Sequence, residues 1–241
     1  MNYPEKLIEK LELKYPLIGL YDAPGPEGFE PVIQPEGGKL SCLYSFLDEW
    51  VSGKMLMLNR ENSGCGGCAY WLFGKENMTR EHRIKFLVGT EGLKDTEELM
   101  DRWLNHEKPY KPEHNNIFLG PLRPEMTQYL KTITFLVNPD QLTILTVASQ
   151  YYHSPDDLLS PVIAPMGSGC MQLLSLFKDL YYPQAIIGAT DIAMRQCLPP
   201  DTLSFTVTEP LFRQFCLLDE RSFLYKSFLD HMKKSRALPS V

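Results

Sequence analysis

The sequence contains little that would suit a membrane protein or a nucleic-acid-binding protein. Of its 241 residues, 24 are basic and 30 are acidic, giving a net charge of −6, whereas a general nucleic-acid binder needs a basic face to neutralise phosphates. The longest apolar stretch, Ile133 to Ala148, is interrupted by the polar segment 138–141, so no segment of the sequence can span a bilayer. The first residues alternate charged and aliphatic side chains instead of forming the apolar run of a signal peptide. We therefore expect a cytoplasmic protein that binds neither nucleic acid nor membranes.

Several familiar catalytic motifs are also missing. The sequence has no Gly-x-Ser-x-Gly elbow for a nucleophilic serine and no His-Glu-x-x-His pair for zinc. It has neither a Walker phosphate-binding loop nor a Gly-x-Gly-x-x-Gly dinucleotide fingerprint. The five histidines fall in polar or loop segments, where a solvent-exposed role is the simpler interpretation. No reaction is therefore indicated by a motif, and the sequence locates a site better than it names a function.

The six cysteines are the most informative residues. A chain of this length can bury its own core, and a reducing cytoplasm keeps thiols free, so the cysteines are buried thiols or are placed for metal or redox chemistry. Cys197 and Cys216 lie among apolar neighbours in the sequence, and we interpret both as core or incidental residues. The other four, Cys42, Cys65, Cys68 and Cys170, lie in or beside glycine-rich segments.

Helical and strand patterns alternate along the chain. Helices are expected where apolar residues recur at helical spacing, and strands where short apolar runs are bounded by turn residues. One helix start is marked by Asn138 as a cap, Pro139 in the first turn and Gln141 at the third position. The expected helices cover residues 4–14, 40–51, 95–104, 139–152 and 171–182, and one long helix or a pair of helices covers 211–236. The expected strands cover 17–21, 55–58, 116–119, 133–137, 162–164, 185–188 and 203–207.

This order of elements predicts the fold class. Strand 133–137 follows strand 116–119 without a helix between them, which favours a mixed sheet over a fully parallel one. We expect an α/β or α+β fold with a mixed central sheet and flanking helices. Residues 1–241 should form a single compact unit, with a weak boundary near the polar, proline-containing segment 105–114.

The first cysteine junction is the glycine-rich segment 61–74. Cys65 and Cys68 are separated by two residues, so both sulfurs can reach one metal ion at about 2.3 Å. The glycines around them permit positive φ angles and leave backbone amides free to bind sulfur or an anion. The same spacing is typical of a thioredoxin-like redox pair at the start of a helix, and also of a tight glycine turn with two incidental cysteines.

The second junction is Gly167-Ser168-Gly169-Cys170, which precedes the expected helix 171–182. A thiol in the first turn of a helix lies near the positive end of the dipole, which lowers its pKa. We therefore expect Cys170 to be the most acidic thiol, and to be alkylated before Cys197 or Cys216. The loop amides would also suit a bound phosphate or carboxylate, and a glycine-rich turn with a buried cysteine is the simpler alternative.

A third cysteine, Cys42, lies at the start of the expected helix 40–51. Junctions of this kind gather at one edge of a sheet when their strands are paired. We therefore predict that Cys65 and Cys170 lie in one pocket, with Cys42 close enough to join them. If their sulfurs were more than about 10 Å apart, no single ion with thiolate bonds of about 2.3 Å could join them.

As a set, these motifs resemble the uncharacterised ArCR family, a bacterial and archaeal family of unknown function. The central match is Glu61-Asn62-x-x-Cys65-x-Gly67, ending in Leu72-x-Gly74. The supporting matches are Cys42, Phe86-Leu87-Val88-Gly89, the Gly169-Cys170 turn and Arg195, and the resemblance extends from Leu17 to Phe215. The resemblance implies single cysteines at positions 42, 65 and 170, so that Cys68 is a departure. It implies no reaction.

The sequence thus predicts a cysteine-lined site and leaves two function classes open. In the first, the protein is redox-type and binds an iron–sulfur cluster or another thiolate-bound metal. In the second, the loops bind a small anionic ligand, or the thiols serve an enzyme without metal. The candidate metal ligands are Cys42, Cys65, Cys68 and Cys170; the candidate ligand-binding residues are Asn62, Gly64, Gly66, Gly67, Gly167, Ser168, Gly169 and Arg195. Neither an oligomeric state nor a substrate is indicated.

Overall fold

A single mixed sheet of eight strands runs through the molecule. The structure is a computed structural model, and it describes residues 3–34, 42–154, 156–157 and 159–237. Within these residues the strand order is β2-β3-β4-β1-β5-β8-β7-β6; the outer pairs β2–β3 and β6–β7 are parallel and the inner pairs are antiparallel. The strands are β1 (Ile18–Ala23), β2 (Val32–Ile33), β3 (Met55–Asn59), β4 (Asn116–Pro121), β5 (Leu130–Val137), β6 (Val162–Ile163), β7 (Ala185–Gly188) and β8 (Leu203–Thr208). The expected α/β architecture with a mixed sheet is confirmed.

Side chains alternate between the two faces of this sheet, as the pleat of a strand requires. On β5, Ile133 and Phe135 enter one apolar cluster, while Leu136 enters the cluster on the opposite face. We call the face that carries Phe118, Phe135 and Phe205 the aromatic face and the face that carries Leu56, Leu119 and Leu136 the thiol face, for the cysteines described below.

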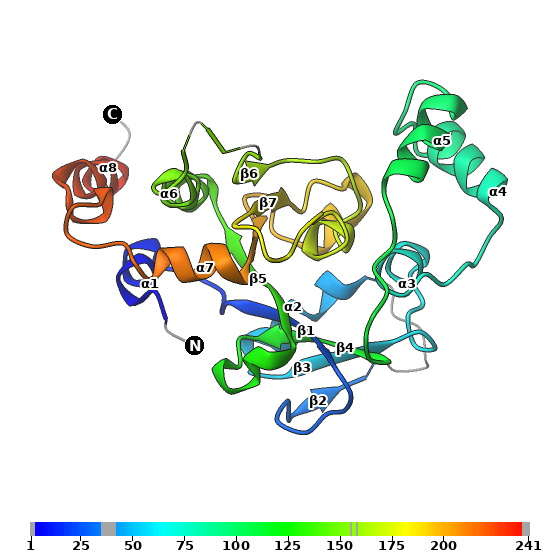
Figure 1. Cartoon of the computed structure of the whole chain (residues 1–241), viewed down its shortest axis with the longest axis horizontal. Helices are drawn as coiled ribbons and strands as arrows, with labels where there is room; N and C mark the ends of the chain where they lie inside the picture. The colour runs from blue at the N-terminus through cyan, green and yellow to red at the C-terminus, as the bar shows by residue number, and fades with distance from the viewer. Residues whose placement is uncertain (1–2, 35–41, 155, 158, 238–241) are drawn as a thin grey trace.

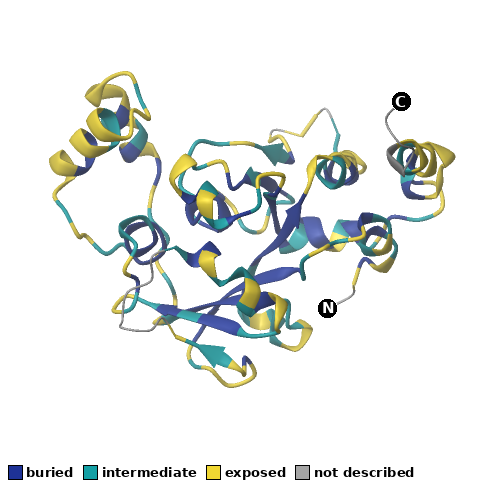
Figure 2. Ribbon diagram, turned by 180° about the vertical axis from the view of Figure 1, so that it is seen from behind, coloured by how far each residue is buried: buried dark blue, intermediate teal, exposed yellow. Residues whose placement is uncertain are grey.

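Helices cover both faces. The aromatic face packs against α1 (Glu5–Leu11), α6 (Pro139–Gln150), α7 (Glu209–Phe215) and α8 (Ser227–Ala237), together with the short η7 (Phe223–Tyr225). The thiol face packs against η2 (Leu43–Phe46), α2 (Leu47–Val51), α3 (Gly66–Phe73), η5 (Met171–Leu173) and η6 (Ile192–Cys197). The same apolar cluster continues beyond α3 into α4 (Arg80–Lys85), η3 (Phe86–Thr90) and α5 (Glu97–His106). A further short helix, η4 (Pro124–Tyr129), precedes β5. In Figure 1, α4 and α5 lie away from the sheet, beyond α3. Figure 2 shows the strands buried at the centre of the molecule and these two helices largely exposed.

The expected helix start at Asn138 is confirmed in detail. The Asn138 side chain accepts from the amide of Gln141, and the Gln141 side chain accepts from the amide of Asn138. This reciprocal capping box fixes the start of α6 directly after β5. None of the described helices has the length and apolar character needed to cross a membrane.

The expected helix 171–182 is wrong. Only η5 forms there, followed by turns in which Leu176 bonds back to Met171 and Phe177 to Leu174. Five apolar side chains between residues 171 and 177 are buried, on more sides than the single apolar face of an amphipathic helix provides. The expected helix 40–51 is also altered: it begins as η2 at Leu43, and residues 40–41 lie outside the described residues.

Segment 105–114 joins neighbouring parts of one sheet. Asp22 on β1 is buried and accepts hydrogen bonds from the Tyr110 hydroxyl and from the amides of Glu113 and His114. The chain then enters β4, which pairs with both β1 and β3. The sheet is therefore continuous on the two sides of this connector, and the fold is a single compact unit.

Candidate functional site

The turn between β3 and α3 is held in shape by two asparagines. Asn59 accepts from the amides of Glu61 and Asn62, while Asn62 accepts from the Asn59 amide and donates to the Met57 carbonyl. These hydrogen bonds hold the Asn62 side chain inside the loop. The loop then leads to Cys65, which is the N-cap residue of α3. Of the two alternatives that the sequence left open for Cys65, a helix start or a tight glycine turn with incidental cysteines, the structure has the helix start.

Cys68 lies one turn into α3 and is buried. Burial raises the pKa of the Cys68 thiol well above its ordinary value, and the thiols of Cys170 and Cys65 add to this effect. The Ser63 side chain hydrogen-bonds the Cys68 thiol and acts in the opposite direction. Cys68 is therefore a protonated thiol at neutral pH that faces other thiols.

Cys170 is also buried, and its sulfur lies 3.1 Å from the Ser168 hydroxyl. Burial raises the pKa of Cys170 to about 12, although the Ser168 hydrogen bond lowers it. The expectation that Cys170 is the most acidic thiol is therefore wrong. The helix that would have supplied a dipole is replaced by η5, and desolvation dominates instead.

Gly67 marks the place where the cysteine junctions meet. A Cβ atom at Gly67 would lie 3.9 Å from both the Cys65 and the Cys170 sulfur, and 3.8 Å from the Ser168 hydroxyl oxygen. The two sulfurs therefore lie no farther apart than twice 3.9 Å. This confirms the prediction that the Cys65 and Cys170 sulfurs lie within about 10 Å of each other, as a shared site requires.

Cys42 lies close to the same group of thiols. It is half-buried before η2, and it contributes to the raised pKa of both Cys68 and Cys170. Burial is the main cause that raises the pKa of Cys42 itself to about 12, with contributions from the thiols of Cys197 and Cys65. The four cysteines predicted as metal ligands thus lie in one region of the thiol face.

Cys197 is the residue that sequence reasoning missed. It was interpreted as a core or incidental residue, yet it lies close enough to Cys42 to help raise the pKa of the Cys42 thiol. Both residues are half-buried and pack against the cluster of the thiol face. Cys216 lies elsewhere, beyond the end of α7, with its sulfur 3.5 Å from the Phe212 carbonyl. We call Cys42, Cys65, Cys68, Cys170 and Cys197 the thiol cluster.

The described residues contain no group of three or more His, Cys, Asp or Glu side chains already arranged to hold a metal ion. Coordination of one ion by three members of the thiol cluster therefore requires their side chains to rotate toward a common point. The surrounding glycines allow close approach of other groups but leave little free space at two positions. A Cβ at Gly169 would lie 2.9 Å from the Tyr44 ring, and one at Gly167 would lie 2.9 Å from Leu176.

The predicted anion-binding side chains are engaged with the protein itself. The Arg195 guanidinium donates to the carbonyls of Ala189, Thr202, Pro199 and Pro200, so it holds the 189–202 loop together. Asn62 is used in the β3–α3 turn as described. Of the predicted glycines, Gly64 is exposed in that turn, and a Cβ at Gly66 would meet the Asn77 amide at 2.7 Å.

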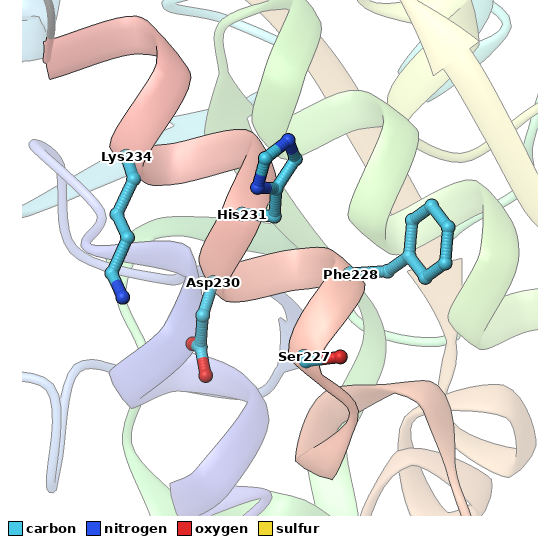
Figure 3. A pocket seen from close by; sticks show the side chains of 5 residues that line it. All are labelled: Ser227, Phe228, Asp230, His231 and Lys234. Carbon is cyan, nitrogen blue, oxygen red and sulfur yellow. The ribbon is translucent and has the colours of Figure 1, made fainter.

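Two hollows of the surface lie away from the thiol cluster. One, of about 470 Å³, lies between the 106–111 connector and the 174–180 turns, and includes three lysines, of which Lys178 pairs with Glu107. The other, of about 510 Å³, is lined by Ser227, Phe228, Asp230, His231 and Lys234, and Figure 3 shows that all five rise from α8 alone. Neither hollow contains a cysteine.

Comparison with known protein families identifies the family of this chain. The model of the uncharacterised ArCR family, domain of unknown function 169, matches residues 6–216, which is most of the chain. The chain belongs to this family. The matched part of this ArCR protein contains all five members of the thiol cluster and ends at Cys216. No curated protein and no solved structure matches the chain.

Proposed function

We propose that this ArCR protein binds an iron–sulfur cluster or another soft metal through the thiol cluster, and that it acts in redox chemistry. The observation that carries the proposal is the position of the Cys65 and Cys170 sulfurs, each 3.9 Å from where a Cβ of Gly67 would lie. These residues come from two different junctions, and Cys42 joins them from a third. Thiols placed together by separate elements are the donor set that soft metals and iron–sulfur clusters prefer.

The protonation of the cluster agrees with a metal-free form of such a site. Burial raises the pKa of Cys42 and of Cys170 to about 12, so both hold their protons at neutral pH. A metal binds the thiolate, so its binding releases these protons and becomes stronger as the pH rises. The neutral thiols keep the empty cluster from carrying several negative charges in a buried place.

The form of the site that we propose is four-thiolate coordination, which requires the side chains to move, because no three of them form a ready metal site among the described residues. Cys42, Cys65, Cys68 and Cys170 supply the four sulfurs that most iron–sulfur clusters use. The Ser168 hydroxyl beside Cys170 is placed to hydrogen-bond a ligand sulfur, whereas the Ser63 hydroxyl donates to the Asn59 carbonyl. Hydrogen bonds to sulfur and burial are two features that set the reduction potential of such a centre. These features support the redox assignment.

The test is reconstitution of the purified full-length protein without oxygen, with iron and sulfide in one series and with zinc or copper(I) in another. We expect stoichiometric metal and, with iron and sulfide, the visible absorption of a cluster. Cys65→Ser and Cys170→Ser should each lower the bound metal at least tenfold. Cys216→Ser is the matched control, because this cysteine lies outside the thiol cluster, and it should bind as the wild type does. Unchanged binding in Cys65→Ser and Cys170→Ser, or no binding by the wild type, would overturn the proposal.

A further inference from the structure

The hollow of about 470 Å³ between the 106–111 connector and the 174–180 turns combines apolar and basic side chains. We call it the lysine hollow. Its lining includes the buried Leu174 and Phe177, and its exposed basic residues are His106, Lys108, Lys111 and Lys178. Among the described residues that line it there is no aspartate or glutamate, although the whole chain has a net charge of −6. A concave surface with apolar lining and charge of one sign suits an organic ion of the opposite sign.

Two of the three lysines have no counter-ion within the protein. Lys178 pairs with Glu107 at 2.5 Å, and the same carboxylate lies 2.9 Å from Nδ1 of His106. Lys108 and Lys111 form no ion pair with any residue that the structure describes. A single lysine of this kind is ordinary on a surface. Two of them on one hollow leave positive charge that the protein does not neutralise, and this charge attracts an anion.

Ser175 supplies a second, independent observation. It lines the lysine hollow, and its hydroxyl oxygen is buried without a hydrogen-bond partner among the described residues. A buried hydroxyl with no partner is costly, and such a group in a folded protein calls for a water or a ligand to satisfy it. A carboxylate in the hollow supplies the missing partner once the Ser175 hydroxyl turns toward it.

Hydrogen bonds hold both walls of the lysine hollow in place. On the connector, Tyr110 donates its amide to the Trp71 carbonyl at 2.9 Å and its hydroxyl to the buried Asp22 at 2.8 Å. On the opposite wall, the Phe177 amide donates to the Leu174 carbonyl at 3.1 Å. The ion pair described above joins the two walls. Walls that are already formed reduce the cost of ordering the site when a ligand binds.

We propose that the lysine hollow binds a small organic anion, a carboxylate on an aromatic or aliphatic body. The apolar body packs against Leu174 and Phe177, Lys108 and Lys111 reach the carboxylate, and the Ser175 hydroxyl donates to it. The volume lies within the range of about 300–1,000 Å³ that small-molecule pockets have. This site goes beyond the proposed function, because no cysteine lines it and it needs no metal.

The test is isothermal titration calorimetry of the reduced, metal-free, full-length protein with benzoate, 1-naphthoate and octanoate. We expect at least one of these carboxylates to bind in a ratio of one to one and to raise the unfolding temperature. The uncharged 1-naphthalenemethanol shares the body of 1-naphthoate, and inorganic phosphate has a charge but no apolar body. Each of these two should bind at least tenfold more weakly than the best carboxylate, since each lacks one half of the recognised chemistry.

Three variants locate the site. Lys108→Met combined with Lys111→Met removes both charges but keeps apolar stems, and it should weaken carboxylate binding at least tenfold. Ser175→Ala should weaken binding about fivefold without lowering the unfolding temperature of the free protein, because the hydroxyl has no partner to lose. Lys226→Met is the matched control: this lysine follows η7, outside the lysine hollow, so its variant should bind as the wild type does.

No binding of any of the three carboxylates, or equal binding of the uncharged alcohol, would overturn the anion site. Equal binding of phosphate would overturn the role of the apolar body. Unchanged binding in the double lysine variant would overturn the lysine hollow as the place of binding, and a lower unfolding temperature of free Ser175→Ala would overturn the role of the hydroxyl. Because the titrations use metal-free protein, failure of metal reconstitution leaves this proposal standing, and failure here leaves the proposed function standing.

Discussion

The two faces of the sheet are built from the same strands but filled with different chemistry. On the aromatic face, Phe135 lies between Phe212 and Phe215, with ring centroids 6.2 and 6.3 Å away. On the thiol face, the neighbouring position of β5 is Thr134, which hydrogen-bonds Thr206 of β8 at 3.0 Å. The same face carries the thiol cluster and the Arg195 clamp.

Both faces bury a large apolar cluster, and under the proposed function the thiol face also carries the site. Aromatic and aliphatic burial lowers the free energy of the folded state without further conditions. Buried hydroxyls and thiols contribute less and must each find a partner, as Thr132 does with the Leu173 carbonyl. Departure from an ordinary apolar core on one face only is typical of a site, because proteins break local packing rules mainly where function requires it.

The largest expected change in stability comes from truncating a buried side chain of the aromatic face. Phe135→Ala should lower the free energy of unfolding by about 3–5 kcal/mol, because it removes a fully buried ring that contacts two others. Urea unfolding followed by circular dichroism measures the loss. A loss below about 1 kcal/mol would contradict the structural role given to this face.

The two faces also show how much of the fold can be predicted from the sequence. Strand periodicity predicted β4, β5, β7 and β8 within a residue or two at most ends, because alternating or continuous apolar runs follow directly from two-sided burial. It could not predict the strand order, in which β1 lies between β4 and β5. That order depends on pairings between distant segments, which leave no local pattern.

Helix 171–182 and Cys197 illustrate the same limit at the site. The apolar spacing after Cys170 is typical of a helix, yet burial of several sides at once favours turns. Cys197 has apolar neighbours along the chain, and it lies close to Cys42 only because η2 and η6 pack together. The junctions of Cys42, Cys65 and Cys170 were recognisable because glycines mark tight turns. The internal partners of Asn62 and Arg195 were not, since any polar side chain at a loop could equally face a ligand.

A second prediction distinguishes the two faces by how the free energy of unfolding depends on pH. The Cys170 pKa is raised to about 12 from an ordinary value of 9.0, mainly by burial. The folded state therefore keeps a proton that the unfolded state loses above about pH 9, so this contribution to stability is complete below pH 9 and is lost as the pH rises toward 12. The expected slope is about 1.4 kcal/mol per pH unit for one such thiol.

Cys170→Ala removes this titrating group, so its stability should fall less steeply with pH than that of the wild type. Urea midpoints at pH 8, 9 and 10 under reducing conditions measure the two slopes. Phe135→Ala is the control: it lowers stability at every pH but should leave the slope unchanged. Parallel curves for Cys170→Ala and the wild type would show that the folded protein does not hold this proton.

The smallest expected change in stability should produce the clearest change at the site. A methyl group at Gly67 would make ordinary contacts, at 3.8–3.9 Å, with Ser168 and with the sulfurs of Cys65 and Cys170. Gly67 lies within α3 and has no positive φ, so Gly67→Ala should leave stability unchanged or raise it by up to about 1 kcal/mol. The same methyl would lie 3.9 Å from each of the two sulfurs that the proposed metal must join, where it would crowd the metal. Reconstitution of Gly67→Ala should therefore bind at least tenfold less metal.

Gly89→Ala is the matched control for this variant. Gly89 lies in η3, also without a positive φ, and a Cβ there would meet no atom within 4 Å. It should bind metal as the wild type does, so that any loss in Gly67→Ala is due to the position of the methyl group rather than to the removal of a glycine. Unfolding midpoints of both variants, measured beside their metal content, separate a blocked site from a weakened fold. Full metal binding by a stable Gly67→Ala would mean that the metal does not lie between Cys65 and Cys170, and the thiol face would then differ from the aromatic face in packing alone.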